Sequence, residues 1–112
     1  MNIHSAASNE IASRLTRLAK LYQQGQASEV TTRTLDKLIE YEAGLTKAQL
    51  DEVRKDLADF ETRYHRTSEQ FYQAYKAGET DDRMDFVEWD SLVQMAENLQ
   101  HRLQLLTDEE ND

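Results

Sequence analysis

Helix-breaking residues are scarce in this chain of 112 residues, and that scarcity most limits what it can fold into. Proline is absent, and the three glycines stand at positions 25, 44 and 78. The other positions are rich in Leu, Ala, Gln, Glu and Arg, which favour helices. No stretch alternates apolar and polar residues for long enough to indicate a strand. We therefore predict an all-α fold of three to four helices, and the chain length predicts a single domain over residues 1–112.

The first predicted helix, N-terminal to the others, covers residues 8–24. Ser8 is a suitable N-cap, and Gly25 suits the left-handed position after the last turn. Apolar residues recur at steps of four, three and four and form one amphipathic face, which consists of Ile11, Leu15, Leu18 and Tyr22.

The second predicted helix covers residues 28–66 and changes phase near Gly44. Leu35, Leu38 and Leu45 share one face before this point. After it, a seam with steps of three and four begins, as in a coiled coil, at Leu50, Val53, Leu57, Phe60 and Tyr64. Either one helix bends at Gly44 or two helices meet there, and we favour the continuous helix.

Two more helices are predicted, a short one over residues 68–77 and a last one over residues 82–106, before a frayed tail at 107–112. Thr67 and Gln70 match a capping box for the short helix. The last helix carries an uninterrupted seam of Trp89, Leu92, Ala96, Leu99, Leu103 and Leu106. Seams this short are unstable alone, so we expect them to pair as a coiled-coil-like antiparallel helical hairpin, with a homo-oligomer or a bound partner adding stability.

Negative charge is concentrated in the C-terminal part of the chain. Residues 1–41 hold five Lys/Arg against four Asp/Glu, whereas residues 42–112 hold eight against eighteen, and the net charge is −9. An acidic chain repels phosphate, so nucleic acid is an unlikely partner and a basic protein a suitable one. No apolar run is long enough for a membrane helix, and the N-terminus lacks a secretory pattern. With no cysteine, the chain fits the cytoplasm.

The stretch "AGETDDRMDFVEWD", residues 77–90, mixes acidic and aromatic side chains. The acids could simply begin the last helix, with Phe86 and Trp89 as core. Alternatively, the acids and aromatics form a surface that binds a basic partner, since Trp and Tyr are common binding anchors. The candidate partner-binding residues are Phe71, Tyr72, Tyr75, Glu79, Asp81, Asp82, Met84, Asp85, Phe86, Glu88 and Trp89. Burial of Trp89 in the core would contradict its place in this surface.

Two Glu–His pairs are the candidates for a metal site. Glu61 with His65, and Glu97 with His101, each lie four residues apart on a predicted helix. The seams direct both histidines toward the flanks, and further carboxylate ligands at core positions are missing. The sequence also lacks a calcium loop, a phosphate-binding glycine loop and a nucleophile with its partners. We therefore expect no enzyme, no metal and no cofactor.

The segments "LAKLYQQGQASEVTTRTLDKLIEYE", "DLADFETRYHRTSEQFYQAYKAGETDD" and "MDFVEWDSLVQM" together resemble a group of small bacterial helical proteins, the antitoxin components of toxin–antitoxin pairs. The resemblance covers roughly residues 15–106, and implies a protein that neutralises a toxin, often an RNA-cleaving one, by direct binding. His65 stands where the group has a glycine, and no separate DNA-binding module is present. The matching positions are Phe60, Tyr64, Ser68, Phe71, Tyr72, Gly78, Asp85, Trp89 and Met95.

Three hypotheses follow for the function. The first is a non-enzymatic, antitoxin-like module that binds a basic partner protein. The second is a self-assembling coiled-coil protein whose seams pair between identical chains. The third is a metal-binding helical bundle that uses the two Glu–His pairs.

Overall fold

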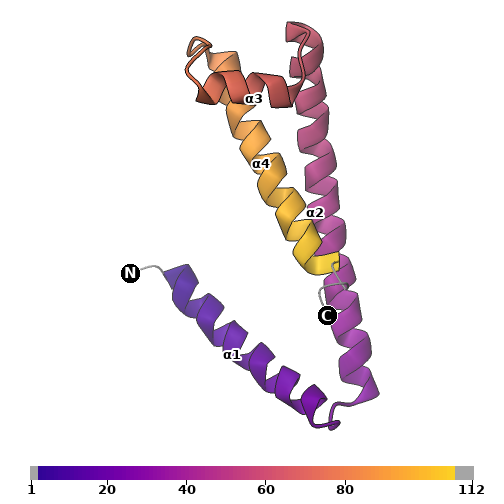
Figure 1. Ribbon diagram of the computed structural model, residues 1–112. Coiled ribbons are helices and arrows are strands. Elements are labelled where there is room, and N and C mark those ends of the chain that lie inside the picture. The colour runs from indigo at the N-terminus through magenta and orange to yellow at the C-terminus, as the bar shows by residue number, and fades with distance from the viewer. Residues whose placement is uncertain (1–2, 108–112) are drawn as a thin grey trace. The chain divides into compact units, whose positions relative to one another are not determined.

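The computed structural model describes residues 3–107, which form four helices and, within that range, no strand. They are α1 (Ile3–Gln23), α2 (Glu29–Tyr64), α3 (Ser68–Lys76) and α4 (Met84–Thr107), as Figure 1 shows. The prediction of an all-α fold is confirmed. The predicted frayed tail lies, apart from Thr107, outside the described residues.

Two compact units divide the chain, and their boundary lies inside α2, between Leu38 and Ile39. The helix itself is uninterrupted there and also runs through Gly44, where a Cβ would meet no other atom within 4 Å. Glycine costs a helix interior only about 1 kcal/mol relative to alanine, which is too little to interrupt a long helix. The prediction that residues 1–112 form one domain stays a prediction.

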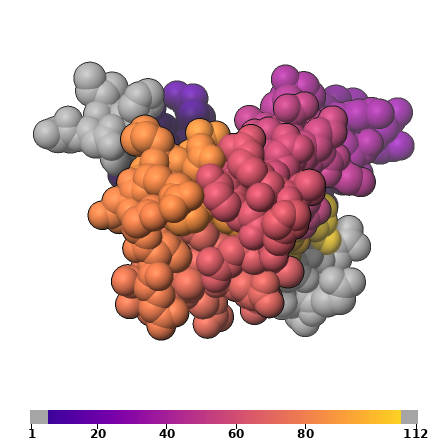
Figure 2. All heavy atoms as spheres, turned by 90° about the horizontal axis from the view of Figure 1, so that it is seen from above, coloured from indigo at the N-terminus to yellow at the C-terminus, as the bar shows by residue number. Residues whose placement is uncertain are grey.

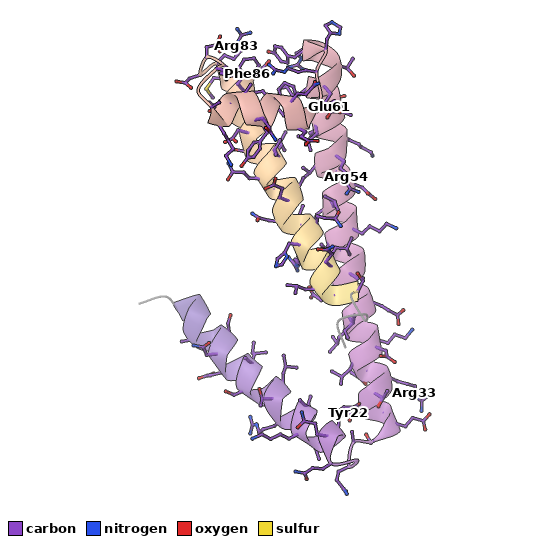
Figure 3. The ribbon with its side chains drawn as sticks, in the orientation of Figure 1. Tyr22, Arg33, Arg54, Glu61, Arg83 and Phe86 are labelled. Carbon is purple, nitrogen blue, oxygen red and sulfur yellow. The ribbon has the colours of Figure 1, made fainter. Side chains whose placement is uncertain are left out.

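The N-terminal unit consists of α1, a short connection and the first turns of α2. Gly25 ends α1 with a φ of 68°, and the N–H of Gln26 donates to the carbonyl of Leu21 at 2.9 Å. The hydroxyls of Tyr22 and Thr32 share a hydrogen bond of 2.7 Å across the connection, and Figure 3 labels Tyr22 beside it. These local bonds define the turn between the two helices.

Large apolar side chains remain exposed along the helices of this unit. Ile11 and Leu15 of α1 are 52% and 51% exposed, and Leu38 of α2 is 54% exposed. The amphipathic faces predicted from the sequence are therefore present, but little of their area is removed from water. Exposed apolar faces of this kind are typical of surfaces that associate with another protein.

The C-terminal unit is an antiparallel hairpin of α2 and α4, with α3 lying across the end where the chain turns (Figure 1). Tyr64 bonds to Asp85 near that end, and Glu42 pairs with Arg102 near the other. Figure 2 looks onto the end of this unit, where α3 and the start of α4 form much of the surface. The predicted helical hairpin is thus the arrangement of this unit.

Aromatic side chains make up the centre of the core. Trp89 lies between Phe71, whose ring is 4.0 Å away and parallel within 1°, and Phe60, at 5.5 Å and 14°. Aromatic pairs contribute roughly 0.5–1.5 kcal/mol beyond the area they bury. The buried core cluster consists of Val53, Phe60, Phe71, Phe86, Trp89, Leu92 and Val93.

The turns before and after α3 are formed by local capping interactions and by residues in the left-handed region. The capping box predicted for Thr67 and Gln70 is present, with both reciprocal hydrogen bonds. His65 ends α2 in the left-handed region with a φ of 54°, and the N–H of Arg66 donates to the carbonyl of Glu61. Gly78 ends α3 in the same way with a φ of 75°. A histidine therefore occupies a backbone position at which glycine is usual.

Candidate functional site

Three aromatic residues of the expected binding surface are buried in the core. Phe71 and Trp89 are 0% exposed and Phe86 is 8% exposed. The expectation that they form a surface is therefore corrected. The physical reason is that α3 folds over the open end of the hairpin, which stacks Phe71 on the Trp89 indole, and Phe60 of α2 stacks with the same indole. In this folded state the three side chains stabilise the hairpin and are not available to a partner.

The remaining candidates lie at or near the surface. Met84 is 78% exposed, and Tyr72 and Tyr75 are half-buried beside the core. Asp85 is also half-buried, whereas the other carboxylates are exposed, namely Glu79, Asp81, Asp82 and Glu88. The surface that remains is thus mainly acidic, with few apolar anchors.

The carboxylate of Asp81 is hydrogen-bonded to Arg83, a residue of the same loop. Its carboxylate accepts two hydrogen bonds from the Arg83 guanidinium, at 2.9 and 2.7 Å, and one from the Arg83 backbone N–H at 3.0 Å. These bonds lower the pKa of Asp81 to about 2. The same guanidinium lies 4.6 Å from the centre of the Phe86 ring, so it also covers the core (Figure 3 labels both residues). Asp81 therefore shapes the loop before α4 and presents little free charge.

Asp85 joins α4 to the end of α2. Its Oδ2 accepts a 2.5 Å hydrogen bond from the Tyr64 hydroxyl and a 3.0 Å bond from Arg63. The Tyr64 bond first, and then the Arg63 guanidinium, hold the pKa of Asp85 below its ordinary value. A charge-assisted pair of bonds of this kind fixes the start of α4 against the last turn of α2.

An acidic groove of about 290 Å³ lies next to this junction, between α2 and α4. Arg63 is the single cationic residue of its lining and is already paired with Asp85. The lining residues are Asp56, Asp59, Phe60, Arg63, Asp85 and Glu88. Excess carboxylate in a concave surface raises the local concentration of cationic groups, so the groove favours Lys or Arg side chains.

Asp56 and Asp59 were not among the candidate residues from the sequence. They lie on α2 at a spacing of three, beside the seam, and Asp85 and Glu88 have the same spacing on α4. This common spacing is a signal that the sequence contains. Its meaning depends on the register of α2 against α4, which sequence spacing alone leaves open.

A larger groove of about 750 Å³ lies between α2, α3 and α4. Its charge is mixed, since Lys76 lies 5.1 Å from the centre of the Tyr72 ring beside two glutamates. The lining residues are Leu57, Ser68, Glu69, Tyr72, Gln73, Lys76, Ala77, Val93, Ala96 and Glu97. Of the candidate residues, it contains only Tyr72 and Glu97.

Ser68 has a structural part in the C-terminal unit. Its Oγ accepts a 2.9 Å hydrogen bond from the indole N–H of Trp89. Its backbone N–H donates a 2.8 Å bond to the carboxylate of Glu61, which Figure 3 labels near the end of α2. One residue thus connects three helices.

The two Glu–His pairs lie on different helices of the hairpin, at the end of α2 and within α4. Glu61 accepts from the first N–H of α3, while His65 is exposed at the end of α2. Glu97 and His101 are exposed farther along α4. Among residues 6–107, whose side chains the structure describes, no group of three or more His, Cys, Asp or Glu side chains is placed to hold a metal ion. The structure therefore does not bring the metal candidates together.

The part of the chain that the structure describes contains no helix with the length and apolar character needed to cross a membrane. No family model, curated protein or solved structure matches the chain. The resemblance to antitoxins therefore stays a prediction.

Proposed function

We propose that this chain is a non-enzymatic, antitoxin-like module that binds and neutralises a basic partner protein in the cytoplasm. The acidic groove of the hairpin, lined by Asp56, Asp59, Asp85 and Glu88, is the observation that carries the proposal. The net charge of −9 acts in the same direction, because it attracts a basic protein and repels phosphate backbones.

The proposed surface differs from the one expected from the sequence. Phe71, Phe86 and Trp89 support it from inside the core. The residues that contact the partner are those of the acidic groove and the exposed residues around the start of α4, such as Met84 and Glu88. Charged groups in such a surface increase the association rate and exclude wrong partners, while a few apolar contacts slow dissociation.

The test is capture of a partner from the host by the tagged full-length chain and by two matched variants. The groove variant combines Asp56→Asn, Asp59→Asn and Glu88→Gln. The control variant combines Asp51→Asn, Glu69→Gln and Glu97→Gln, which changes the net charge equally at exposed positions outside the acidic groove. We expect one basic protein to be captured by the wild type and the control, at near equal stoichiometry, and lost by the groove variant.

The captured protein is then expressed alone and together with this chain. Growth arrest by the protein alone, and recovery on co-expression, support neutralisation of a toxin. Capture that is equal for all three proteins contradicts a role for the acidic groove. A captured protein that does not affect growth contradicts the antitoxin-like part of the proposal.

A second candidate function is self-assembly, which the exposed apolar faces of the N-terminal unit favour. Ile11, Leu15 and Leu38 each leave about half of their surface exposed. Faces of this kind can pair between identical chains as a helical bundle. Sedimentation equilibrium of the wild type and two variants tests this candidate. We expect the wild type to form a stable homo-oligomer, the Leu15→Glu variant to be monomeric, and the control variant Gln24→Glu, changed at an exposed polar position, to remain oligomeric. A wild-type chain that is monomeric at all concentrations excludes it.

A further inference from the structure

An apolar groove and the acidic groove follow the same side of the α2–α4 hairpin. The apolar groove, about 450 Å³, is lined by Gln49, Glu52, Val53, Met95, Asn98 and Leu99. On α2, Glu52, Asp56, Asp59 and Arg63 are spaced by four, three and four residues, which places them in one row. On α4, a row with steps of three and four runs from Asp85 through Glu88, Leu92 and Met95 to Leu99. Both grooves therefore lie between the same two rows.

The apolar and acidic grooves together form one combined groove, whose chemistry changes along its length. Toward Leu99 its floor is apolar, because Val53 is buried and Met95 is 48% exposed beside it. Toward Asp85 it is lined by carboxylates of both helices. From Asp85 to Leu99 the row on α4 covers about 21 Å at 1.5 Å per residue, which is about four helical turns. A single helix of the partner can follow this whole length.

Charge decides which kind of helix fits. Among the described residues that line these two grooves, only Arg63 and Asp85 form a salt bridge. Glu52, Asp56, Asp59 and Glu88 remain for cations from outside the unit. An amphipathic helix with an apolar stripe at positions i, i+3, i+4 and i+7, and with Lys or Arg near one end, complements both halves.

We propose that this combined groove binds an amphipathic basic helix of the partner, with its apolar stripe over Val53, Met95 and Leu99 and its cations among Asp56, Asp59 and Glu88. The inference rests on the proposed function and specifies the recognition element of the partner. Packing a third helix against two antiparallel helices completes a bundle, which buries the exposed part of Met95. The larger groove beside α3 is excluded by its mixed charge and by Lys76.

The probe is a synthetic peptide of about 18 residues, about five helical turns, with Leu at i, i+3, i+4 and i+7 and Arg in its last two turns. A scrambled peptide of identical composition serves as its control. Binding to the full-length chain is measured by isothermal titration calorimetry at 0.15 M salt, a concentration that screens charges over about 8 Å. We expect the helical peptide to bind about tenfold more tightly than the scrambled one, because only it presents a continuous apolar stripe.

Two kinds of variant locate the site. Met95→Glu places a charge in the apolar floor at an exposed position, and the groove variant Asp56→Asn, Asp59→Asn, Glu88→Gln removes the acidic end. Each should weaken binding of the helical peptide by about tenfold, whereas the control Asp51→Asn, Glu69→Gln, Glu97→Gln should change it by less than about twofold. Circular dichroism confirms that all variants keep the helical content of the wild type.

Three outcomes overturn the inference. The first is equal affinity for helical and scrambled peptides, and the second is a loss in the control variant as large as that in the groove variant. The third is a homodimer of the chain that the helical peptide dissociates, which makes a second copy the occupant. If the host partner is captured through the acidic groove but the helical peptide binds no better than its scrambled form, the inference fails while the proposed function stands.

Discussion

The indole Nε1 of Trp89 donates a 2.9 Å hydrogen bond to Oγ of Ser68, which connects α4 to the first residue of α3. The same serine donates its backbone N–H to Glu61 of α2 at 2.8 Å. The polar group of a fully buried indole is thereby satisfied, so its burial brings the apolar gain without the cost of an unpaired donor. Within residues 6–107, no buried side-chain nitrogen or oxygen lacks a partner.

Replacing Ser68 with alanine should leave the indole N–H of Trp89 without an acceptor. A buried unsatisfied donor costs about 1–3 kcal/mol, so we expect Ser68→Ala to lower the free energy of unfolding by that amount. Urea unfolding followed by circular dichroism measures it. Ser91→Ala, at an exposed position of α4, is the control and should stay within about 0.5 kcal/mol of the wild type. Equal stability of the two variants would show that the Trp89–Ser68 bond contributes nothing.

Replacing Trp89 with alanine should lower the free energy of unfolding, and any loss of partner binding should follow from that loss of stability. The side chain is fully buried between Phe60 and Phe71, and a Trp→Ala change in a core costs about 3–5 kcal/mol. Urea unfolding of Trp89→Ala beside Met84→Ala tests this, since Met84 is 78% exposed and its change should be small. Normal stability of Trp89→Ala together with lost partner binding would restore Trp89 to the binding surface.

His65→Gly should stabilise the chain. His65 has a φ of 54°, where a side chain costs about 1–2 kcal/mol, and part of the gain is offset by the greater freedom of glycine when unfolded. We expect a net increase of about 0.5–1 kcal/mol in the free energy of unfolding. Gly78→Ala is the converse change at a φ of 75° and should destabilise, although space for its Cβ is open. Loss of stability in His65→Gly would mean that the imidazole makes a contribution beyond backbone geometry.

Gly44→Ala should also stabilise the chain, for a different reason. Gly44 lies within α2, and a Cβ there meets no atom within 4 Å. Alanine in an exposed helix interior is favoured over glycine by about 0.8–1 kcal/mol. Thermal unfolding followed by circular dichroism should show a higher midpoint than for the wild type. A lower midpoint would indicate that a close approach of another chain requires glycine at this position.

Asp85 should make stability depend on pH in the acidic range. Its pKa is lowered in the folded state, chiefly by Tyr64 and then by Arg63, so the contribution of the carboxylate is present above an unfolded pKa of about 3.9. It is lost as the pH falls through the folded pKa. We expect Asp85→Asn to be less stable than the wild type at pH 7 and the difference to shrink by about pH 2, as urea midpoints at both pH values can measure. Asp82→Asn changes an exposed neighbour and is the control, whose stability should differ little from that of the wild type. If Asp85→Asn were less stable than the wild type by the same amount at both pH values, the predicted dependence of stability on the protonation of Asp85 would be contradicted.

The described structure shows why local features were predictable. The capping box of Thr67 and Gln70 depends on residues three apart, so spacing alone reveals it. The seam from Leu50 to Tyr64 predicts one face of a helix for the same reason. The aromatic stack required more, because nothing in the spacing of Phe71 indicates that α3 crosses the hairpin and covers Trp89.

By itself, the sequence determined the all-α class, the uneven charge and the apolar face of each helix, because these depend on residue type and on helical periodicity. Only the tertiary structure decided that Trp89 belongs to the core and that Asp56 and Asp59 face the same groove as Glu88. An apolar stripe specifies that a face will be covered, and either the same chain or a partner can cover it. The choice depends on the register of α2 against α4 and on the path of α3, which are set by the packing of aromatic rings distant in sequence.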